Sequence, residues 1–327
     1  MYSDDDGSRV SGPRLLGDVG GTHARFAWQA GPGEPLEHLR TLGCGAYERF
    51  EDALGAYLAD LPAEPPVAAA VAIANPVQGD GVRMTNHHWS FSIQALRAAM
   101  GWRRFVVLND FSALALALPA IEPSELRQVG EGKARPGPCA VLGPGTGLGV
   151  SGLLPVGDGR QLPISGEGGH VTLAATDARE ARVLALLRRR FEHVSAERVL
   201  SGPGLVNLYE AVCEVYGWRP QRLTPADVSH CALRGSDQAC VEAVALFGAF
   251  LGNVAGNLAL TLGAIGGVYI GGGIVPRLGP VFEASPFRER FEGKGRFRDY
   301  LALIPTCVIS SAQSPSLLGA ARALDGR

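Results

Sequence analysis

Lysine is almost absent from this sequence of 327 residues. Among its 30 basic residues only Lys133 and Lys294 are lysines, and both lie in glycine-flanked stretches. A Walker loop requires Gly-Lys followed by Ser or Thr, whereas Ala134 and Gly295 follow the two lysines. So few lysines also disfavour Schiff-base chemistry. If the chain binds a nucleotide, it must hold the phosphates by another kind of loop.

Paired cysteines and an excess of basic charge are also missing. The six cysteines, at positions 44, 139, 213, 231, 240 and 307, form no Cys-x-x-Cys pair and no regular spacing. This pattern disfavours a zinc cluster or a disulfide framework and favours a reducing compartment. The net charge of −2 lacks the basic excess of a nucleic-acid-binding protein. We therefore expect a cytoplasmic protein that binds no nucleic acid.

Neither a signal peptide nor a membrane span is expected. Residues 1–11, with three consecutive aspartates, lack a basic start and an apolar run, and they predict a disordered tail. Residues 243–276 carry no charge, which exceeds the roughly 20 residues that span a bilayer. Because Asn253 and Asn257 interrupt this stretch, we interpret it as a buried helix followed by a central strand, with no membrane partner. Within it, Gly248, Gly252 and Gly256 predict close helix packing.

One pattern occurs twice: a strand, a glycine-rich turn and a second strand. Residues 15–28 contain the first copy, with its turn at 17–22, and residues 140–154 contain the second, with its turn at 143–149. The repetition predicts two related α/β halves. Between and beyond these copies, periodicity predicts helices at 50–61, 93–100, 112–118 and 181–191, and buried strands at 67–73, 105–108 and 267–270.

Glycine-rich turns between strands can hold phosphate groups, because their consecutive backbone N–H groups point outward. Each turn alone is also explained as a plain chain reversal. Two turns with similar neighbours, and a third glycine run at 271–273 after a predicted strand, favour a nucleotide site. Gly147-x-Gly149-x-x-Gly152 formally matches the dinucleotide fingerprint, but a strand follows it where that fingerprint requires a helix.

Asn109 and Asp110 follow a buried strand, at the end where open α/β sheets bind ligands. An aspartate there can act as a general base towards a hydroxyl group. The alternative is that these residues cap the helix that starts near Ser112.

Glu167-Gly-Gly-His170 offers a carboxylate and an imidazole on an irregular backbone, which suits a polyhydroxylated ligand. The alternative for this motif is a turn with solvated polar tips. His87 and His88 either line a site or cover a surface, and the sequence does not decide between these two roles.

Together these residues resemble the bacterial ATP-dependent glucokinases of the hexokinase, actin and Hsp70 superfamily, and the resemblance covers nearly the whole chain. The segments that carry it are Leu16-Gly-Asp-Val-Gly-Gly-Thr22, Met84-Thr-Asn-His87, Leu108-Asn-Asp-Phe111, Gly145-Thr-Gly-Leu-Gly149, Gly166-Glu-Gly-Gly-His170, His193-Val-Ser-Ala-Glu-Arg-Val-Leu-Ser-Gly-Pro-Gly204 and Gly271-Gly-Gly-Ile-Val-Pro-Arg277.

The resemblance implies an α/β fold with two actin-like (ribonuclease H-like) domains that flank a cleft. Residues 12–120 and 311–327 would form the small domain, and residues 121–310 the large one. The implied reaction is transfer of the γ-phosphoryl group of ATP to the 6-hydroxyl of glucose, with Mg²⁺ as cofactor, in a cytoplasmic homodimer at the first step of glucose catabolism.

The resemblance also implies the site residues. Asp110 would be the general base, and Asp18 would orient the magnesium ion through water. The residues implied to bind the sugar are Asn109, Asp110, Glu167, His170 and Glu197. Those implied to face the nucleotide are Gly17, Asp18, Val19, Gly20, Gly21, Thr22, Gly145, Thr146, Gly147, Gly271, Gly272 and Gly273.

The sequence departs from the family pattern at two positions. His23 stands where asparagine is usual after Gly-Gly-Thr, and Pro144 stands where alanine is common in the second loop. The cysteine-rich zinc motif of the related repressor and open-reading-frame kinase family is absent. Two alternatives to a glucokinase stay open: a kinase for another hexose, since one or two contacts redirect sugar choice, and a sugar sensor without catalysis.

Overall fold

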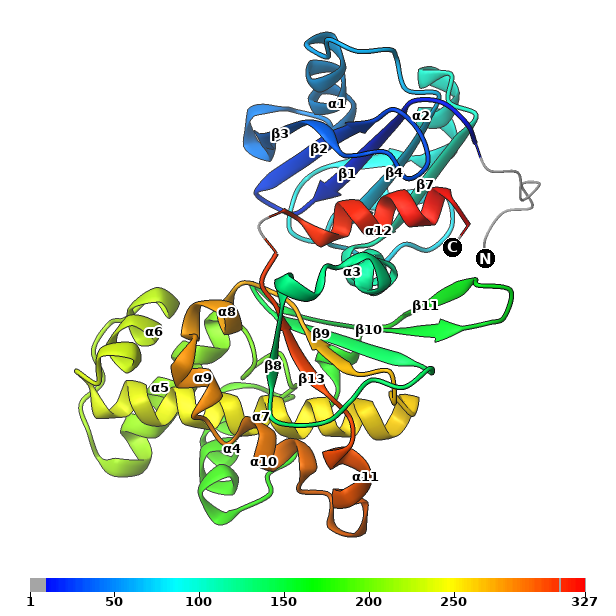
Figure 1. The fold of residues 1–327 in the computed structure, drawn as a ribbon. Helices are drawn as coiled ribbons and strands as arrows, with labels where there is room; N and C mark the ends of the chain where they lie inside the picture. Colours follow the sequence, from blue (N-terminus) through cyan, green and yellow to red (C-terminus); the bar gives the residue numbers. More distant parts are fainter. Residues whose placement is uncertain (1–9, 312, 327) are drawn as a thin grey trace. The chain divides into compact units, whose positions relative to one another are not determined.

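The computed structural model describes residues 10–311 and 313–326, which form a mixed α/β protein (Figure 1). Most of the predicted disordered tail, residues 1–9, lies outside the described residues. The chain divides into two compact units. The first contains the residues up to Glu122, Leu153–Ser165 and the residues from Ser311 onward, and the second contains Pro123–Gly152 and Gly166–Ser310.

The first unit is built on a sheet of five strands in the order β3-β2-β1-β4-β7. β1, β4 and β7 are parallel, and β2 and β3 continue the sheet antiparallel. The strands are β1 (Arg14–Val19), β2 (His23–Gln29), β3 (Glu37–Gly43), β4 (Ala68–Ile73) and β7 (Arg104–Asn109), with a separate hairpin of β5 (Gly81–Arg83) and β6 (Ser90–Ser92).

Helices cover both faces of this sheet (Figure 1). Because successive strand residues face opposite sides, Leu15 and Val19 pack into one cluster with side chains of α1 and α2. Leu16 packs on the other side, against α12. The helices of this unit are α1 (Phe50–Ala59), α2 (Ile93–Met100), α3 (Asp110–Ala117) and α12 (Pro315–Leu324).

The second unit contains most of a six-stranded sheet in the order β11-β10-β9-β12-β13-β8. Its strands are β8 (Leu126–Val129), β9 (Cys139–Pro144), β10 (Leu148–Pro155), β11 (Gln161–Ser165), β12 (Val268–Ile270) and β13 (Thr306–Ile309). Its helices are α4 (Ala178–Arg190), α5 (Gly202–Tyr216), α6 (Pro225–Arg234), α7 (Gln238–Leu262), α8 (Ile274–Leu278), α9 (Pro280–Glu283), α10 (Phe287–Glu292) and α11 (Arg298–Ala302). Short 3₁₀ turns lie at Cys44–Ala46, Leu118–Ala120, Pro123–Glu125, Gly168–His170 and Gly295–Phe297.

The two sheets repeat one strand order. β3-β2-β1-β4-β7 corresponds to β11-β10-β9-β12-β13, with β8 added at the edge. In both sheets the first strand of the hairpin is parallel to the two strands beyond it: β1 to β4 and β7 in one sheet, and β9 to β12 and β13 in the other. The prediction of two related α/β halves is therefore confirmed.

The end of β10 and all of β11 group with the first unit, although the predicted division placed residues 153–165 in the large domain. The physical reason is a contact with α3: Ser165 Oγ and Ser112 Oγ lie 3.0 Å apart and share a hydrogen bond. Arg322 of α12 also donates to the Gln161 side chain at 2.9 Å.

Several helices begin at a polar residue whose side chain accepts a hydrogen bond from the first turn, as expected of an N-cap. These residues are Ser92, Asn109, Asp177, Ser201, Thr224 and Asp237. Two of these helices begin earlier than predicted. The helix predicted at 112–118 begins at residue 110, after the cap Asn109, and the helix predicted at 181–191 begins at residue 178, after the cap Asp177.

The long uncharged segment forms α7 and β12, as predicted. α7 is long and apolar enough to cross a membrane, but 78% of its most apolar window is buried among other residues of the structure. Its three glycines face α10 and the segment before it: a Cβ at Gly252 would overlap the Phe287 carbonyl oxygen, and one at Gly256 the Phe291 carbonyl oxygen. α7 is thus a core helix whose small residues allow close packing.

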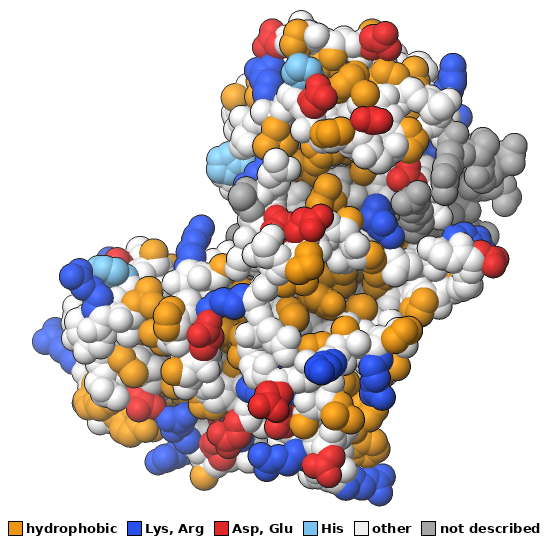
Figure 2. Space-filling view, viewed as in Figure 1, with side chains coloured by type: hydrophobic (Ala, Val, Ile, Leu, Met, Phe, Trp, Pro, Cys, Tyr) orange, Lys and Arg blue, Asp and Glu red, His pale blue; other side chains and the backbone are white. Residues whose placement is uncertain are grey.

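Charged side chains of both signs are interspersed on the face of the molecule shown in Figure 2. This distribution agrees with the near balance of 30 Lys and Arg against 32 Asp and Glu.

Candidate functional site

In the first unit, the predicted site residues lie at one edge of the sheet, where the parallel strands β1, β4 and β7 end. Val19 is aligned with Ile73, and Ile73 with Asn109, in adjacent strands. The glycine turn after β1 and the Asn109-Asp110 pair after β7 therefore emerge at the same edge. This is the edge at which open α/β sheets bind ligands.

Asn109 caps α3 and also contacts Asp110. Its Oδ1 accepts hydrogen bonds from the backbone N–H groups of Phe111 at 2.9 Å and Ser112 at 3.2 Å. Its Nδ2 donates to Asp110 Oδ1 at 3.0 Å and to the Asn75 carbonyl at 3.4 Å. The capping interpretation is thus right for Asn109. It does not exclude the catalytic one, because Asp110 stands in the first turn of the helix, where the macrodipole stabilises an anion.

The first glycine motif divides between strand and turn. Gly17, Asp18 and Val19 are the last residues of β1, and only Gly20, Gly21 and Thr22 form the turn.

The turn is closed by the Gly20 N–H, which donates to the His23 carbonyl at 2.9 Å. A Cβ at Gly21 would lie 3.0 Å from the Asn86 carbonyl oxygen. Glycine therefore lets the segment around Asn86 pack directly on the turn.

That segment is fastened to the end of β4 by Asn75. The Asn75 Oδ1 atom accepts hydrogen bonds from the Thr85 backbone N–H at 2.9 Å and from the Thr85 hydroxyl. The motif at residues 84–87 thus lies beside the first glycine turn, although the two are more than 60 residues apart in sequence.

His87 and His88 have packing roles. The His87 ring lies between the rings of His88, with centroids 4.3 Å apart, and Trp89, at 4.6 Å. Burial, and to a smaller extent the neighbouring His88, lowers the pKa of His87. His88 Nε2 lies 2.7 Å from the Glu48 carbonyl oxygen. These contacts give His87 a packing role beside His88 and Trp89.

In the second unit, the second glycine turn lies between β9 and β10 at Gly145, Thr146 and Gly147. The Gly145 N–H donates to the Gly147 carbonyl at 2.8 Å, and the Gly202 N–H donates to the Gly145 carbonyl at 2.8 Å. The second bond attaches the start of α5 to the turn.

Glu197 and the third glycine run contact the same turn. Glu197 Oε2 accepts from the Leu148 backbone N–H at 2.9 Å, and a Cβ at Gly147 would overlap this oxygen. A Cβ at Gly272, whose φ is +76°, would overlap the Pro144 carbonyl oxygen. Gly271, Gly272 and Gly273 lie between β12 and α8, so the second and third glycine motifs are brought together.

Glu167 and His170 flank a 3₁₀ turn in which the His170 N–H donates to the Glu167 carbonyl at 3.0 Å. The Glu197 N–H donates to the Gly169 carbonyl at 2.8 Å, which links this turn to Glu197. A Cβ at Gly169 would overlap the Leu148 carbonyl oxygen. The Glu167 and His170 side chains are both exposed. Exposure agrees with a binding role and equally with the alternative of a turn with solvated polar tips, so it does not separate the two.

Sequence reasoning missed two polar residues beside these motifs. Asn75 follows the buried strand that precedes Pro76, so the argument applied to Asn109 would also have found it. Ser314, whose hydroxyl donates to Asp18 Oδ2 at 2.6 Å, lies 296 positions from Asp18 and has no local sequence signal.

The residues present are compatible with Mg²⁺ held mainly by a nucleotide. The described part of the chain contains no cluster of three or more His, Cys, Asp or Glu side chains that could bind a metal ion. Mg²⁺ commonly uses one or two carboxylates together with substrate phosphates and keeps several waters. Asp18, beside the first glycine turn, is a carboxylate of the required kind.

Comparison with known proteins gives a match along almost the whole chain. The family model described as Glucokinase matches residues 15–327. The chain is 56% identical over 315 residues to a glucokinase of Aromatoleum aromaticum, with 96% of this chain and 95% of that protein covered.

Solved structures agree with the sequence match. The crystal structure of a glucokinase from an Antarctic psychrotroph superimposes with a TM-score of 0.89 at 35% identity, covering 96% of this chain and 99% of the other. A ROK family glucokinase from Streptomyces griseus, crystallised with glucose and AMPPNP, superimposes with a TM-score of 0.63 at 17% identity, covering 95% and 99% of the two chains. The second likeness shows a shared fold.

Proposed function

The chain belongs to the glucokinase family, with the two-domain actin-like α/β fold that the sequence predicts, and we propose that Asp110 is the general base of its reaction. The substrates proposed are ATP and glucose, and the products are ADP and glucose 6-phosphate. The observation that carries the assignment of the base is the position of Asp110. It stands in the first turn of α3, hydrogen-bonded by Asn109, at the sheet edge that also carries the first glycine turn.

In the proposed mechanism Asp110 accepts the proton of the 6-hydroxyl of glucose, and that oxygen forms a bond to the γ-phosphorus of ATP. The bond from the γ-phosphorus to the bridging oxygen breaks, and its electron pair leaves with ADP. General bases of this kind typically contribute about 10² to 10⁴ in rate. Asn109, Glu167, His170 and Glu197 are proposed to hold the sugar hydroxyls.

The glycine motifs are proposed to bind the phosphates through backbone N–H groups, which replaces the lysine that a Walker loop would supply. Mg²⁺ supplies positive charge to the β- and γ-phosphates when it is bound. In this proposal Asp18 binds a water of that ion. The protein is further proposed to act as a homodimer in the cytoplasm. Six cysteines that are all free agree with a reducing compartment.

The test is a coupled assay with ATP and a series of hexoses, comparing wild type with Asp110→Asn. The amide keeps the shape of the side chain but cannot accept the proton, so turnover should fall by about 10² or more while the affinity for glucose changes little. Asp60→Asn, at an exposed position paired with Arg40, is the control and should keep full activity.

Three outcomes would change the proposal. Near-normal kcat in Asp110→Asn would remove the assignment of the base. A clear preference for fructose or mannose would replace glucose by another hexose, because substrate choice depends on a few contacts. Glucose binding by the wild type without any ATP turnover would favour the sensor.

A further inference from the structure

A serine at the start of α12 does not cap its own helix. Ser314 occupies the N-cap position, where a serine side chain usually accepts a hydrogen bond from the first turn, but it forms no such bond. Its hydroxyl instead donates to Asp18 Oδ2 at 2.6 Å. A serine cap typically stabilises a helix by about 1 kcal/mol. At Ser314 this capping hydrogen bond is absent, and the hydroxyl contacts Asp18 instead.

Asp18 is held through one of its two carboxylate oxygens. Oδ2 accepts from Ser314 and from Arg25 Nη1, the latter at 3.2 Å, while the described residues donate no hydrogen bond to Oδ1. Asp18 and Arg25 are opposite each other in β1 and β2. The Arg25 side chain is 44% exposed, and ion pairs at such positions hold a carboxylate weakly. Ser314 therefore fixes the orientation of Asp18 and leaves Oδ1 available.

α12 is itself firmly placed, so the hydroxyl is presented in a fixed position. Leu16 packs against Leu317 and the alanines of α12, and Asp18, two residues further along β1, faces the same side of the sheet. A Cβ at Gly319 would overlap the Ala113 carbonyl oxygen, which shows how closely α12 lies on α3. Groups held this rigidly need no rearrangement before they bind a ligand.

We propose that Ser314 is a positioning residue for the metal-nucleotide site: it orients Asp18 so that Oδ1 accepts a hydrogen bond from the water shell of the nucleotide-bound magnesium ion. The inference rests on the proposed function, which places Asp18 beside the ATP phosphates. Carboxylates that bind a metal directly are commonly oriented by a hydrogen-bonding partner, and loss of that partner typically lowers metal affinity by about 10- to 100-fold. Because Asp18 would act through water, the effect of losing Ser314 should lie at the lower end of this range.

The experiment uses the full chain and two readouts. The first is the binding of Mn²⁺ with AMPPNP, measured by electron paramagnetic resonance and calorimetry, which requires no turnover. The second is the dependence of glucose phosphorylation on free Mg²⁺. Ser314→Ala should weaken binding of the metal complex by about 10-fold and raise the Mg²⁺ requirement similarly, with the KM for glucose unchanged. Ser314→Thr keeps a hydroxyl and should restore both values.

Ser92→Ala is the matched control. Ser92 is also an N-cap serine that donates to an aspartate, Asp80, at 2.5 Å, and it also caps α2 by accepting from the Ala95 N–H. This variant should melt at a lower temperature but keep the metal dependence of the wild type. The contrast separates a positioning role from a general loss of stability. If Ser314→Ala misfolds, Ser314→Gly takes its place, because glycine also lacks the hydroxyl and is tolerated at an N-cap position.

The outcomes for this inference differ from those for the function. If a folded Ser314→Ala protein binds Mn²⁺ and AMPPNP like the wild type and needs no more Mg²⁺, Ser314 has no positioning role even though glucose is phosphorylated. The role is also refuted if a folded Ser314→Thr protein, which keeps the hydroxyl, binds the metal complex about 10-fold more weakly than the wild type. If the wild type phosphorylates no hexose but Ser314→Ala still weakens metal-nucleotide binding, the proposed function fails while the role of Ser314 stands.

Discussion

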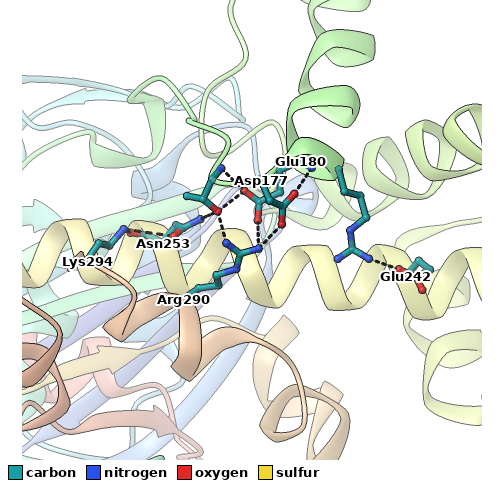
Figure 3. A network of polar contacts seen from close by, with 8 residues as sticks. Asp177, Glu180, Glu242, Asn253, Arg290 and Lys294 are labelled. Carbon is teal, nitrogen blue, oxygen red and sulfur yellow. Dashed lines mark hydrogen bonds and ion pairs between the residues drawn. The ribbon is translucent and has the colours of Figure 1, made fainter.

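A buried carboxylate in the second unit shows how single residues connect helices that are distant in sequence. Glu180 of α4 is fully buried and accepts hydrogen bonds from the Thr176 backbone at 2.6 Å and the Thr176 hydroxyl at 2.7 Å. Arg290 of α10 contacts both Glu180, at 3.2 Å, and Asp177 (Figure 3). Lys294 donates to the Asn253 carbonyl of α7 at 3.2 Å. The network ties α4 and α10 to α7.

The charge of Asp177 should stabilise this network at neutral pH. Burial acts to raise the pKa of Asp177, but hydrogen bonds from the Glu180 backbone and the Arg290 side chain outweigh it, and the pKa lies below its ordinary value of 3.8. Because the folded-state pKa is depressed, the stabilisation is present above pH 3.8 and is lost as the pH falls through the folded-state value.

Asp177→Asn isolates this charge, because asparagine caps a helix as well as aspartate does. We expect the variant to lose about 0.5 to 1 kcal/mol at pH 7, a small value because the Asp177 side chain is 38% exposed. The difference from wild type should shrink as urea unfolding is repeated below pH 3.8. Asp177→Ala should lose about 1 kcal/mol more at every pH, because it also removes the cap. A pH-independent difference for Asp177→Asn would contradict the charge effect.

At this scale the sequence indicates which residues are candidates for the site better than it indicates their hydrogen-bond partners. Asn109 and Asp110 could be singled out because they follow a buried apolar strand. Ser314 and Arg290 could not, since each meets its carboxylate across more than 100 positions of sequence, and such contacts depend on the tertiary fold.

Among the elements, α7 depends most clearly on small side chains. Gly248 and Gly252 face the segment that leads into α10, and a Cβ at either position would overlap Ser285 or Phe287. The backbone oxygen of Phe287, unlike the end of a flexible side chain, cannot move aside without shifting α10. The close approach of the two helices therefore requires glycine at position 252.

Gly252→Ala should destabilise the protein by about 1 to 3 kcal/mol, the usual cost of overpacking, although alanine favours the helix by about 1 kcal/mol. Gly55→Ala in α1 is the control, because no atom beyond the neighbouring residues and backbone of its own helix lies within 4 Å of its Cβ position. That substitution should stabilise by about 0.5 to 1 kcal/mol. Chemical denaturation of both variants tests the pair, and equal stabilisation by the two alanines would show that α10 does not press on α7.

The sequence predicts strands that contain an apolar run and misses most of the other strands. β4, β7, β9 and β12 appear as apolar runs, so their prediction is confirmed, although β7 lies at the edge of its sheet. β3, β8 and β11 were not predicted, and all three are edge strands. Edge strands carry exposed polar residues, and β11 contains Pro163, which an edge tolerates because fewer of its N–H groups need partners. β13 was also missed, although its four residues are all buried.

On the scale of the whole molecule, the chain leaves the first unit and returns to it. After β13 the last segment forms α12, which covers the face of the first sheet that carries Leu16 and Ala70. Arg14 at the start of β1 is 1% exposed and pairs with Asp325 at 2.6 Å. The first unit therefore cannot complete its core or balance this charge until the end of the chain is in place.

Deleting residues 311–327 should unfold the first unit and leave the second folded. The deletion exposes the face covered by Leu317 and Leu324, each worth about 1.5 to 3 kcal/mol of buried apolar surface. It also removes Asp325, the charged partner of Arg14, and leaves Arg14 with the Gln29 side chain as its acceptor. Together these losses equal much of the 5 to 15 kcal/mol that stabilises a typical domain. The main core of the second unit contains no residue of the deleted segment.

Limited proteolysis with mass spectrometry tests this expectation directly. In the truncated chain, cleavage should be rapid within residues 14–109, whereas α5 and α7 stay protected. The full-length protein with Leu303→Ser, a change at a 58% exposed side chain of the second unit, is the control and should resist the protease like the wild type. Protection of β1 and β4 in the truncated chain would show that the first unit folds without α12. Uniform cleavage of both units would show instead that the second unit does not stay folded once the first unit has unfolded.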